Sequence, residues 1–84
     1  MKLTAELSLY PLDEAYIPII KGFIERLAQA SDVTVVTNAM STQLCGDWDT
    51  VMALVNRCLR ESAEQHGKQV LVCKFIPGEL DING

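Results

Sequence analysis

Two short polar segments carry the residues of this chain that are best suited to bind a ligand. The segment Ser8-Leu9-Tyr10-Pro11-Leu12 offers a hydroxyl and a phenol. The segment Ser41-Thr42-Gln43-Leu44-Cys45-Gly46-Asp47 offers two hydroxyls and a carboxylate directly before Trp48. Hydroxyls donate and accept hydrogen bonds, a carboxylate accepts them, and an aromatic ring stacks on another flat ring. This combination predicts recognition of a small molecule rather than a reaction centre.

The same residues give little support to catalysis. No neighbouring base activates Ser41 or Thr42 as a nucleophile, and no G-x-S-x-G motif surrounds them. His66 is the single histidine of the sequence, and one histidine without a fixed partner does not make an acid–base pair. We therefore expect a protein that is not an enzyme and has no catalytic residues.

The cysteines give no sign of a metal or a redox centre. The spacing of Cys45, Cys58 and Cys73 matches no zinc or redox motif, so we expect no metal and no other cofactor. Their odd number argues against a disulfide framework, which favours a reducing compartment. The sequence contains no apolar run of about 20 residues, and charges interrupt the N-terminal segment where a signal peptide would be apolar. These features predict a cytosolic protein that does not cross a membrane.

Size and composition predict one self-associating domain. The 84 residues carry a net charge of -4 without a basic stripe, which argues against nucleic acid as a partner. Hydrophobic residues make up 49% of the chain. Because a domain this small buries only about 60% of its unfolded surface, its core cannot use all of that apolar material. We expect a homodimer or a higher homo-oligomer.

Hydrophobic periodicity predicts four strands and two helices within a single domain, residues 1–84. The strands are expected at residues 3–10, 33–37, 40–45 and 69–76. The helices are expected from near Tyr16 to about residue 30 and over residues 48–65, and a polar tail from about residue 77. The order βαββαβ is that of a ferredoxin-like α+β fold, a four-stranded antiparallel sheet with both helices on one face. In that topology the first and third strands are central.

Strand alternation brings the two polar segments together. Ser41 and Gln43 share one face of the third strand, and pairing with the first strand places Glu6 and Ser8 beside them. A carboxylate in a partly covered sheet needs a partner. For Glu6 that partner is either a ligand or a neighbouring subunit, and the sequence leaves both open.

Some of these residues also have a structural interpretation. Gly46 and Asp47 form a strand-to-helix corner in which Asp47 is a good N-cap, and Trp48 suits a core or an interface. The first helix carries an apolar stripe through Ile17, Ile20, Ile24, Leu27 and Ala28. The fourth strand is apolar on both faces, so one set of its side chains must lie on the helix-free face, where sheet-to-sheet dimerisation would bury it.

The two polar segments resemble a known family. Residues 5–12 are similar to the SLYPL opening of the YkoF-type thiamine/hydroxymethylpyrimidine-binding proteins, and residues 41–47 are similar to that family's ST-x-L-x-G-D segment. Tyr16, Ile17 and Ile20 fit its first helix, which opens with an aromatic residue and an aliphatic pair. The resemblance covers nearly the whole chain in order and spacing.

The resemblance implies a ferredoxin-like domain that binds the pyrimidine part of thiamine or a precursor, in vitamin uptake or handling rather than catalysis. Single-domain members of such a family self-associate, which agrees with the composition. The motif match implies ligand-binding roles for Ser8, Tyr10, Ser41, Thr42, Gly46 and Asp47. To these we add Glu6 and Trp48 from the expected geometry.

Three hypotheses follow. The first is a binding protein for thiamine or hydroxymethylpyrimidine, in which Asp47→Asn or Ser41→Ala lowers affinity. The second is a structural or regulatory module that uses the open sheet face to bind another protein, and the third is a small ferredoxin-like enzyme. A phosphorylated ligand would need a basic group, and few lysines lie near the motifs, so unphosphorylated ligands are favoured.

Overall fold

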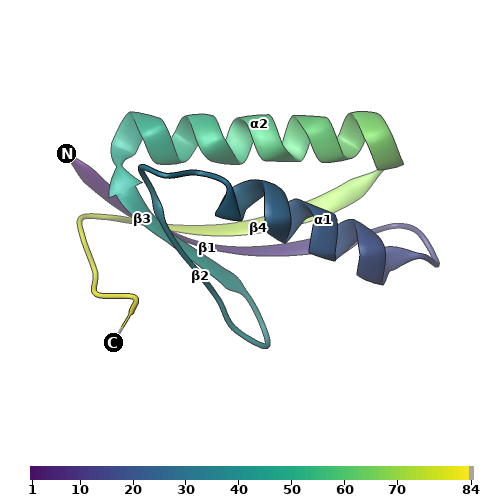
Figure 1. Ribbon diagram of the computed structural model, residues 1–84, viewed down its shortest axis with the longest axis horizontal. Coiled ribbons are helices and arrows are strands. Elements are labelled where there is room, and N and C mark those ends of the chain that lie inside the picture. The colour runs from purple at the N-terminus through teal and green to yellow at the C-terminus, as the bar shows by residue number, and fades with distance from the viewer. Residues whose placement is uncertain (84) are drawn as a thin grey trace.

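The predicted ferredoxin-like fold is confirmed in the computed structural model, which describes residues 1–83. The order of elements is β1 (Lys2–Pro11), α1 (Tyr16–Ala28), β2 (Thr34–Thr37), β3 (Thr42–Asp47), α2 (Trp48–His66) and β4 (Gln69–Pro77). The four strands pair antiparallel in the order β2-β3-β1-β4, and both helices cover the same face of the sheet (Figure 1). As expected, β1 and β3 are the central strands.

The alternation of β1 sets the two faces of the sheet. Leu3, Ala5, Leu7 and Leu9 are buried beneath the helices. The even-numbered residues lie on the open face, where Glu6 is opposite Gln43 of β3 and Lys74 of β4. Because paired residues on neighbouring strands share a face, this register also places Val70, Val72 and Ile76 on the open face.

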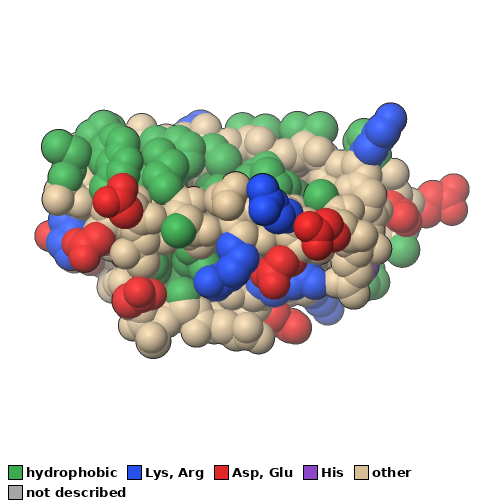
Figure 2. All heavy atoms as spheres, turned by 90° about the horizontal axis from the view of Figure 1, so that it is seen from above, with side chains coloured by type: hydrophobic (Ala, Val, Ile, Leu, Met, Phe, Trp, Pro, Cys, Tyr) green, Lys and Arg blue, Asp and Glu red, His purple; other side chains and the backbone are tan. Residues whose placement is uncertain are grey.

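The helix α2 is positioned as the sequence predicts. It begins directly after Asp47 and ends at Gly67, whose φ of 84° is accessible to glycine without strain. One face of α2 is buried against the sheet, through Val51, Leu54, Val55, Cys58 and Ser62. Acidic and basic side chains are interspersed over the middle of the helix side of the molecule, seen in Figure 2, where no patch of one sign stands out.

Of the apolar stripe expected on α1, only Leu27 is fully buried in the structure. The buried residues of this helix are Ile19, Phe23 and Leu27, whereas Ile17 is 54% exposed and Ile20 and Ile24 are only partly buried. The helix rests on the sheet through the stripe that carries Phe23, its largest apolar side chain. The second apolar stripe is therefore left at the rim of the sheet.

The third strand begins two residues later than the sequence predicts. Met40 is 89% exposed, and the backbone N–H of Asn38 donates to the Ser41 carbonyl at 2.8 Å, which closes the turn between β2 and β3. The last pair between β1 and β3 is therefore Leu7 with Thr42, although β1 continues to Pro11. This difference in strand length leaves part of β1 without a neighbour on the β3 side.

The segment after β4 folds back onto Thr4. The Thr4 hydroxyl donates to the Gly78 carbonyl at 3.0 Å, and its oxygen accepts from the Leu80 N–H at 3.1 Å. Thr4 is consequently buried although it lies on the open face. In residues 1–83 no helix combines the length and the apolar character that a membrane span requires.

Candidate ligand-binding site

A cavity opens where β1 continues beyond its last pair with β3. From Ser8 to Pro11, β1 keeps β4 on one side but has no paired strand on the other, and α1 lies across this gap. The cavity has a volume of about 430 Å³, within the range of small-molecule sites. The residues that line it are Leu7, Ser8, Leu9, Tyr10, Pro11, Tyr16, Ile20, Phe23, Ile24, Thr37, Asn38, Ala39, Met40, Ser41 and Thr42.

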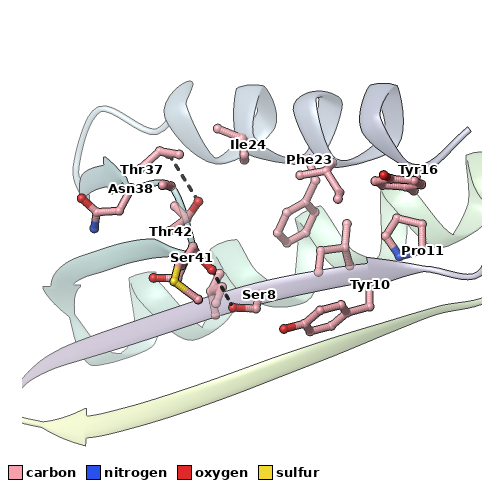
Figure 3. Close-up of a pocket in the computed structure, with 15 residues that line it drawn as sticks. Ser8, Tyr10, Pro11, Tyr16, Phe23, Ile24, Thr37, Asn38, Ser41 and Thr42 are labelled. Carbon is pink, nitrogen blue, oxygen red and sulfur yellow. Dashed lines mark hydrogen bonds between the residues drawn. The ribbon is translucent and has the colours of Figure 1, made fainter.

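The walls of the cavity are apolar and its polar groups gather at one end. In Figure 3, Phe23 and Ile24 extend from α1 toward β1, while Ser8, Ser41 and Thr42 lie together where β1 passes the turn before β3. None of the fifteen described lining residues carries a charge. Such a lining suits an uncharged, largely flat molecule with a few hydrogen-bonding groups on one edge.

The hydroxyls at this end are already held by neighbours. The Ser8 hydroxyl donates to the Met40 carbonyl at 3.4 Å, and the Thr37 and Thr42 hydroxyl oxygens lie 3.3 Å apart. The Ser41 hydroxyl donates to a Glu6 carboxylate oxygen at 3.0 Å. A hydroxyl whose single proton is committed in this way presents its lone pairs to the cavity.

Glu6 connects the cavity with the open face of the sheet. Its carboxylate also accepts from the Gln43 side-chain amide at 3.4 Å and lies 3.6 Å from the Lys74 ammonium. The hydrogen bonds from Ser41 and Gln43, together with the Lys74 charge, hold the pKa of the Glu6 carboxyl below its ordinary value. The sequence predicted this juxtaposition of Glu6, Ser41 and Gln43 from strand alternation.

Two tyrosines flank the cavity. Tyr10 is 56% exposed and lies on the side of β1 away from α1, whereas Tyr16 stands at the start of α1 near Pro11 (Figure 3). Each ring leaves a large part of its surface open to solvent. Either ring can therefore cover a flat ligand at the mouth of the cavity.

The structure divides the predicted site residues between the two ends of β3. Ser8, Tyr10, Ser41 and Thr42 line the cavity, and Glu6 contacts Ser41 directly. Gly46, Asp47 and Trp48 lie at the far end of β3, where Asp47 is opposite Lys2. Lys2 and Ser8 are six positions apart on β1, a separation of about 20 Å at the rise of an extended strand.

Asp47 forms an ion pair rather than facing the cavity. Its carboxylate lies 3.0 Å from the Lys2 ammonium, and the hydrogen bond and charge of Lys2 lower the pKa of Asp47 while the pKa of Lys2 is raised. Asp47 stands at the N-cap of α2, but its side chain makes no capping hydrogen bond. The Asp47 carboxylate therefore joins the N-terminal end of β1 to the start of α2.

Gly46 and Trp48 have packing roles in the same corner. Gly46 packs beside Asp32 and Val33, because a Cβ atom at this position would lie 3.4 Å from both the Asp32 carbonyl oxygen and a Val33 methyl group, an ordinary van der Waals distance. Trp48 is partly buried against the core, and its backbone N–H donates to the Met1 carbonyl at 2.9 Å.

The sequence did not identify the residues that α1 and the β2–β3 turn contribute to the cavity, namely Tyr16, Ile20, Phe23, Ile24, Asn38, Ala39 and Met40. A signal was present for the helix. Its apolar residues form a broader stripe than the core requires, and the surplus, Ile20 and Ile24, lines the cavity.

Metal chemistry finds no support in the described part of the chain. Within residues 1–83 no group of three or more His, Cys, Asp or Glu side chains is arranged to hold a metal ion. The three cysteines are free, and burial raises the pKa of Cys58 and Cys73. Thiols that resist deprotonation in this way are poor nucleophiles at neutral pH.

Comparison with known proteins agrees with the fold and the motifs. A family described as thiamine-binding protein matches residues 5–74. Protein SP2199 of Streptococcus pneumoniae is 26% identical, with a TM-score of 0.87 over 99% of this chain and 94% of that one. A hypothetical protein of Methanocaldococcus jannascii, MJ1052, is 27% identical, with a TM-score of 0.80 over 99% and 87%.

A third structure, TM0486 of Thermotoga maritima, is described as a candidate thiamine biosynthesis/salvage protein. It is 18% identical, with a TM-score of 0.85 over 99% of this chain and 92% of that one, and at this identity it shows the shared fold alone. No functionally curated protein matches the sequence.

Proposed function

The chain belongs to the thiamine-binding protein family, and on that premise we propose that it binds thiamine or its hydroxymethylpyrimidine precursor in the cavity between α1 and β1. The observation that carries the proposal is the convergence of Ser8, Tyr10, Ser41 and Thr42, from both polar segments, on one largely apolar cavity. The name of the Thermotoga maritima relative, which refers to thiamine biosynthesis or salvage, points the same way. The role would be uptake or handling of the vitamin without catalysis.

The chemistry of the cavity suits an aminopyrimidine. Such a ring presents an exocyclic amine and ring nitrogens along its edge, and two apolar faces. The edge would meet the Ser8 and Ser41 hydroxyls, while the faces would contact Phe23 and the aliphatic wall of α1. The thiazolium ring of thiamine is positively charged, and it would be accommodated best on the Ser41 side, toward the Glu6 carboxylate.

We also propose that the protein is a homodimer or a higher homo-oligomer through the open sheet face. Tyr10, Val70, Val72 and Ile76 are each between 45% and 56% exposed there, a concentration of apolar surface unusual for a monomer of this size. Another copy of the same face would bury these side chains. The three free cysteines support a reducing compartment such as the cytosol.

The same apolar face favours one alternative function. A regulatory or structural module that binds another protein through the open sheet would need such a surface, and it would not need the cavity. One measurement distinguishes the two functions, because only the vitamin-binding function predicts that a small molecule stabilises the fold.

The experiment is thermal unfolding with and without thiamine and hydroxymethylpyrimidine. A ligand at about 100 times its Kd adds about 2.7 kcal/mol, which raises the Tm of a small domain by several degrees. Ala39→Trp, which would fill the cavity from the exposed β2–β3 turn, should abolish the shift. If millimolar concentrations of both compounds leave the wild-type Tm unchanged, the binding function is wrong and the interaction module takes its place.

A further inference from the structure

We infer that the unpaired edge of β1 at Leu9 binds the ligand through its backbone N–H and C=O, so that the site selects a heterocyclic ring with an amino group beside a ring nitrogen. This inference rests on the proposed function and names the chemical class that the cavity accepts. Three observations support it: the direction of the β1 backbone, the hydrogen bonds that the Ser8 and Ser41 hydroxyls donate within the protein, and the absence of charged side chains among the described residues that line the cavity.

The direction of the β1 backbone follows from three hydrogen bonds. The Lys2 carbonyl accepts from the Gly78 N–H and the Leu12 N–H donates to the Lys68 carbonyl, and both partners flank β4. The Met1 carbonyl accepts from the Trp48 N–H, directly after β3. In a strand, the N–H and C=O of one residue point to the same side and successive residues alternate. Even-numbered residues of β1 therefore bond toward β4 and odd-numbered residues toward β3.

Leu9 is the odd-numbered residue that comes after the last pair with β3. Leu7 pairs with Thr42, but no residue of β3 is paired with Leu9. Among the backbone hydrogen bonds of turns and loops in residues 1–83, none involves Leu9. Its side chain is buried in the core, while its N–H and C=O lie in the plane of the sheet and point to the β3 side, where the cavity lies.

A backbone donor and acceptor in a largely apolar cavity require a partner. A single extended residue offers N–H and C=O side by side, and in a sheet both are taken by one residue of the next strand. A flat heterocycle with a ring nitrogen next to an amino group offers the complementary acceptor and donor. Such a ring can take the position that β3 leaves vacant.

Ser8 and Ser41 favour a ligand ring with an amino substituent over one with an oxo substituent. The Ser8 proton is donated to Met40 and the Ser41 proton to Glu6, so both hydroxyls present acceptors to the cavity. With the Leu9 carbonyl, the site then offers several acceptors and one N–H donor. An amino group supplies two N–H donors, whereas the corresponding oxo ring supplies one and adds a further acceptor, so the amino form is preferred.

The test uses backbone esters, which an 84-residue chain permits by chemical synthesis. In the first variant the amide N–H of Leu9 is replaced by an ester oxygen and the side chain is kept. In the matched control the same replacement is made at Thr4, whose N–H points toward Ile76 of β4 and which does not line the cavity. Affinity for hydroxymethylpyrimidine is measured by calorimetry, and stability by thermal unfolding without ligand.

We expect opposite effects from the two esters. The Leu9 ester should lose about tenfold in affinity and keep its Tm, because its N–H has no partner in the free protein. The Thr4 ester should lose Tm and keep its affinity. Wild-type protein should bind two compounds at least about tenfold more weakly than hydroxymethylpyrimidine. They are the 4-oxo analogue, in which the amino group is replaced, and the phosphate ester of hydroxymethylpyrimidine itself.

Two results would overturn the inference while leaving the proposed function intact. One is a Leu9 ester that binds as tightly as wild type, and the other is equal affinity for the amino and oxo compounds. The second comparison needs no variant, so it decides the matter even if an ester fails to fold. Wild-type protein that binds neither thiamine nor hydroxymethylpyrimidine would overturn both proposals together.

Discussion

At the scale of single residues, Ser41 has the most informative position. Its hydroxyl belongs to the cavity, yet its proton is donated to Glu6 on the open face. Ser41 is therefore the point at which the network of Glu6, Gln43 and Lys74 reaches the proposed ligand. A change in any member of this network should alter how the cavity presents its acceptors.

The first prediction concerns Ser41→Ala. It should weaken hydroxymethylpyrimidine binding about five- to tenfold, because one acceptor is lost, while the fold is retained. Isothermal titration calorimetry measures the change. The matched control is Asp47→Asn, which breaks the ion pair with Lys2 at the other end of β3 and should leave affinity unchanged. Equal losses in the two variants would contradict the location of the site.

The second prediction is that the stability of the fold depends on pH through the titration of Glu6. The pKa of this carboxyl is lower in the fold than its ordinary value of 4.5, so the unfolded chain binds more protons in that range. The stabilisation by Glu6 is thus complete above pH 4.5 and is lost as the pH falls through the lower folded value. Urea unfolding from about pH 6 to pH 3 measures the loss.

Glu6→Gln should flatten this pH profile, since the titrating group is removed. Glu25→Gln, on the exposed surface of α1, is the control and should leave the slope as in wild type. The Glu6 network would not be the source of the dependence if both variants followed the wild-type curve.

Strand alternation correctly predicted which polar side chains of the two segments lie together. The period of two places Glu6, Ser8, Ser41 and Gln43 on one face, and the structure joins three of them through hydrogen bonds. Alternation cannot report which end of a strand a side chain occupies relative to a cavity. Asp47 belongs to the same polar segment as Ser41, but at the strand's rise the intervening residues carry it well away from the cavity.

At the scale of elements, the cavity results from a mismatch between β1 and β3. The turn from Asn38 to Ser41 delays β3, and α1 covers the gap with a second apolar stripe. The order and type of all six elements were predictable because their periodicity is clear, and because Pro or Gly marks the ends of β1, β3, α2 and β4. The lateral position of α1 was not, since two apolar stripes lie side by side on this helix and the sequence does not indicate which one the core uses.

The third prediction is that the two apolar stripes of α1 have different roles, one in the core and one in ligand binding. Ile24→Ala should cost about 1 kcal/mol or less in unfolding free energy, because the side chain is only partly buried, but it should weaken ligand binding. Leu27→Val removes one methylene from a fully buried side chain that does not line the cavity. It should cost about 1 kcal/mol and leave affinity unchanged.

Urea unfolding and calorimetry on the same preparations give both quantities for Ile24→Ala and Leu27→Val. A loss of affinity in Leu27→Val that equals the loss in Ile24→Ala would mean that α1 acts only through the stability of the fold. The proposed contact between α1 and the ligand would then be wrong.

At the scale of the whole molecule, the helix face and the open face of the sheet differ in kind. The helices carry interspersed charges (Figure 2). The open face combines exposed Val70, Val72 and Ile76 with the Glu6–Lys74 pair. The composition indicated surplus apolar surface, and the register of β4 locates it. The geometry of any assembly depends on contacts between copies, which the sequence of one chain does not encode in a readable pattern.

The fourth prediction is that Ile76→Lys shifts the protein from an oligomer to a monomer. A lysine there would place an unpaired charge inside a sheet-to-sheet interface, opposite Thr4 and distant from the cavity. Sedimentation velocity measures the effect, with Asn56→Lys on the exposed face of α2 as the control. A wild-type protein that sediments as a monomer at micromolar concentration would contradict the proposed interface.

The most direct test of the central claim is the location of the ligand in solution. We would record amide chemical shifts of the isotope-labelled protein during titration with hydroxymethylpyrimidine and with thiamine. The largest changes are expected at Ser8, Leu9, Tyr10, Ser41 and Thr42, with little change at Asp47 and Trp48. Changes centred on Asp47 and Trp48, or no saturable change with either compound, would contradict binding in the cavity between α1 and β1.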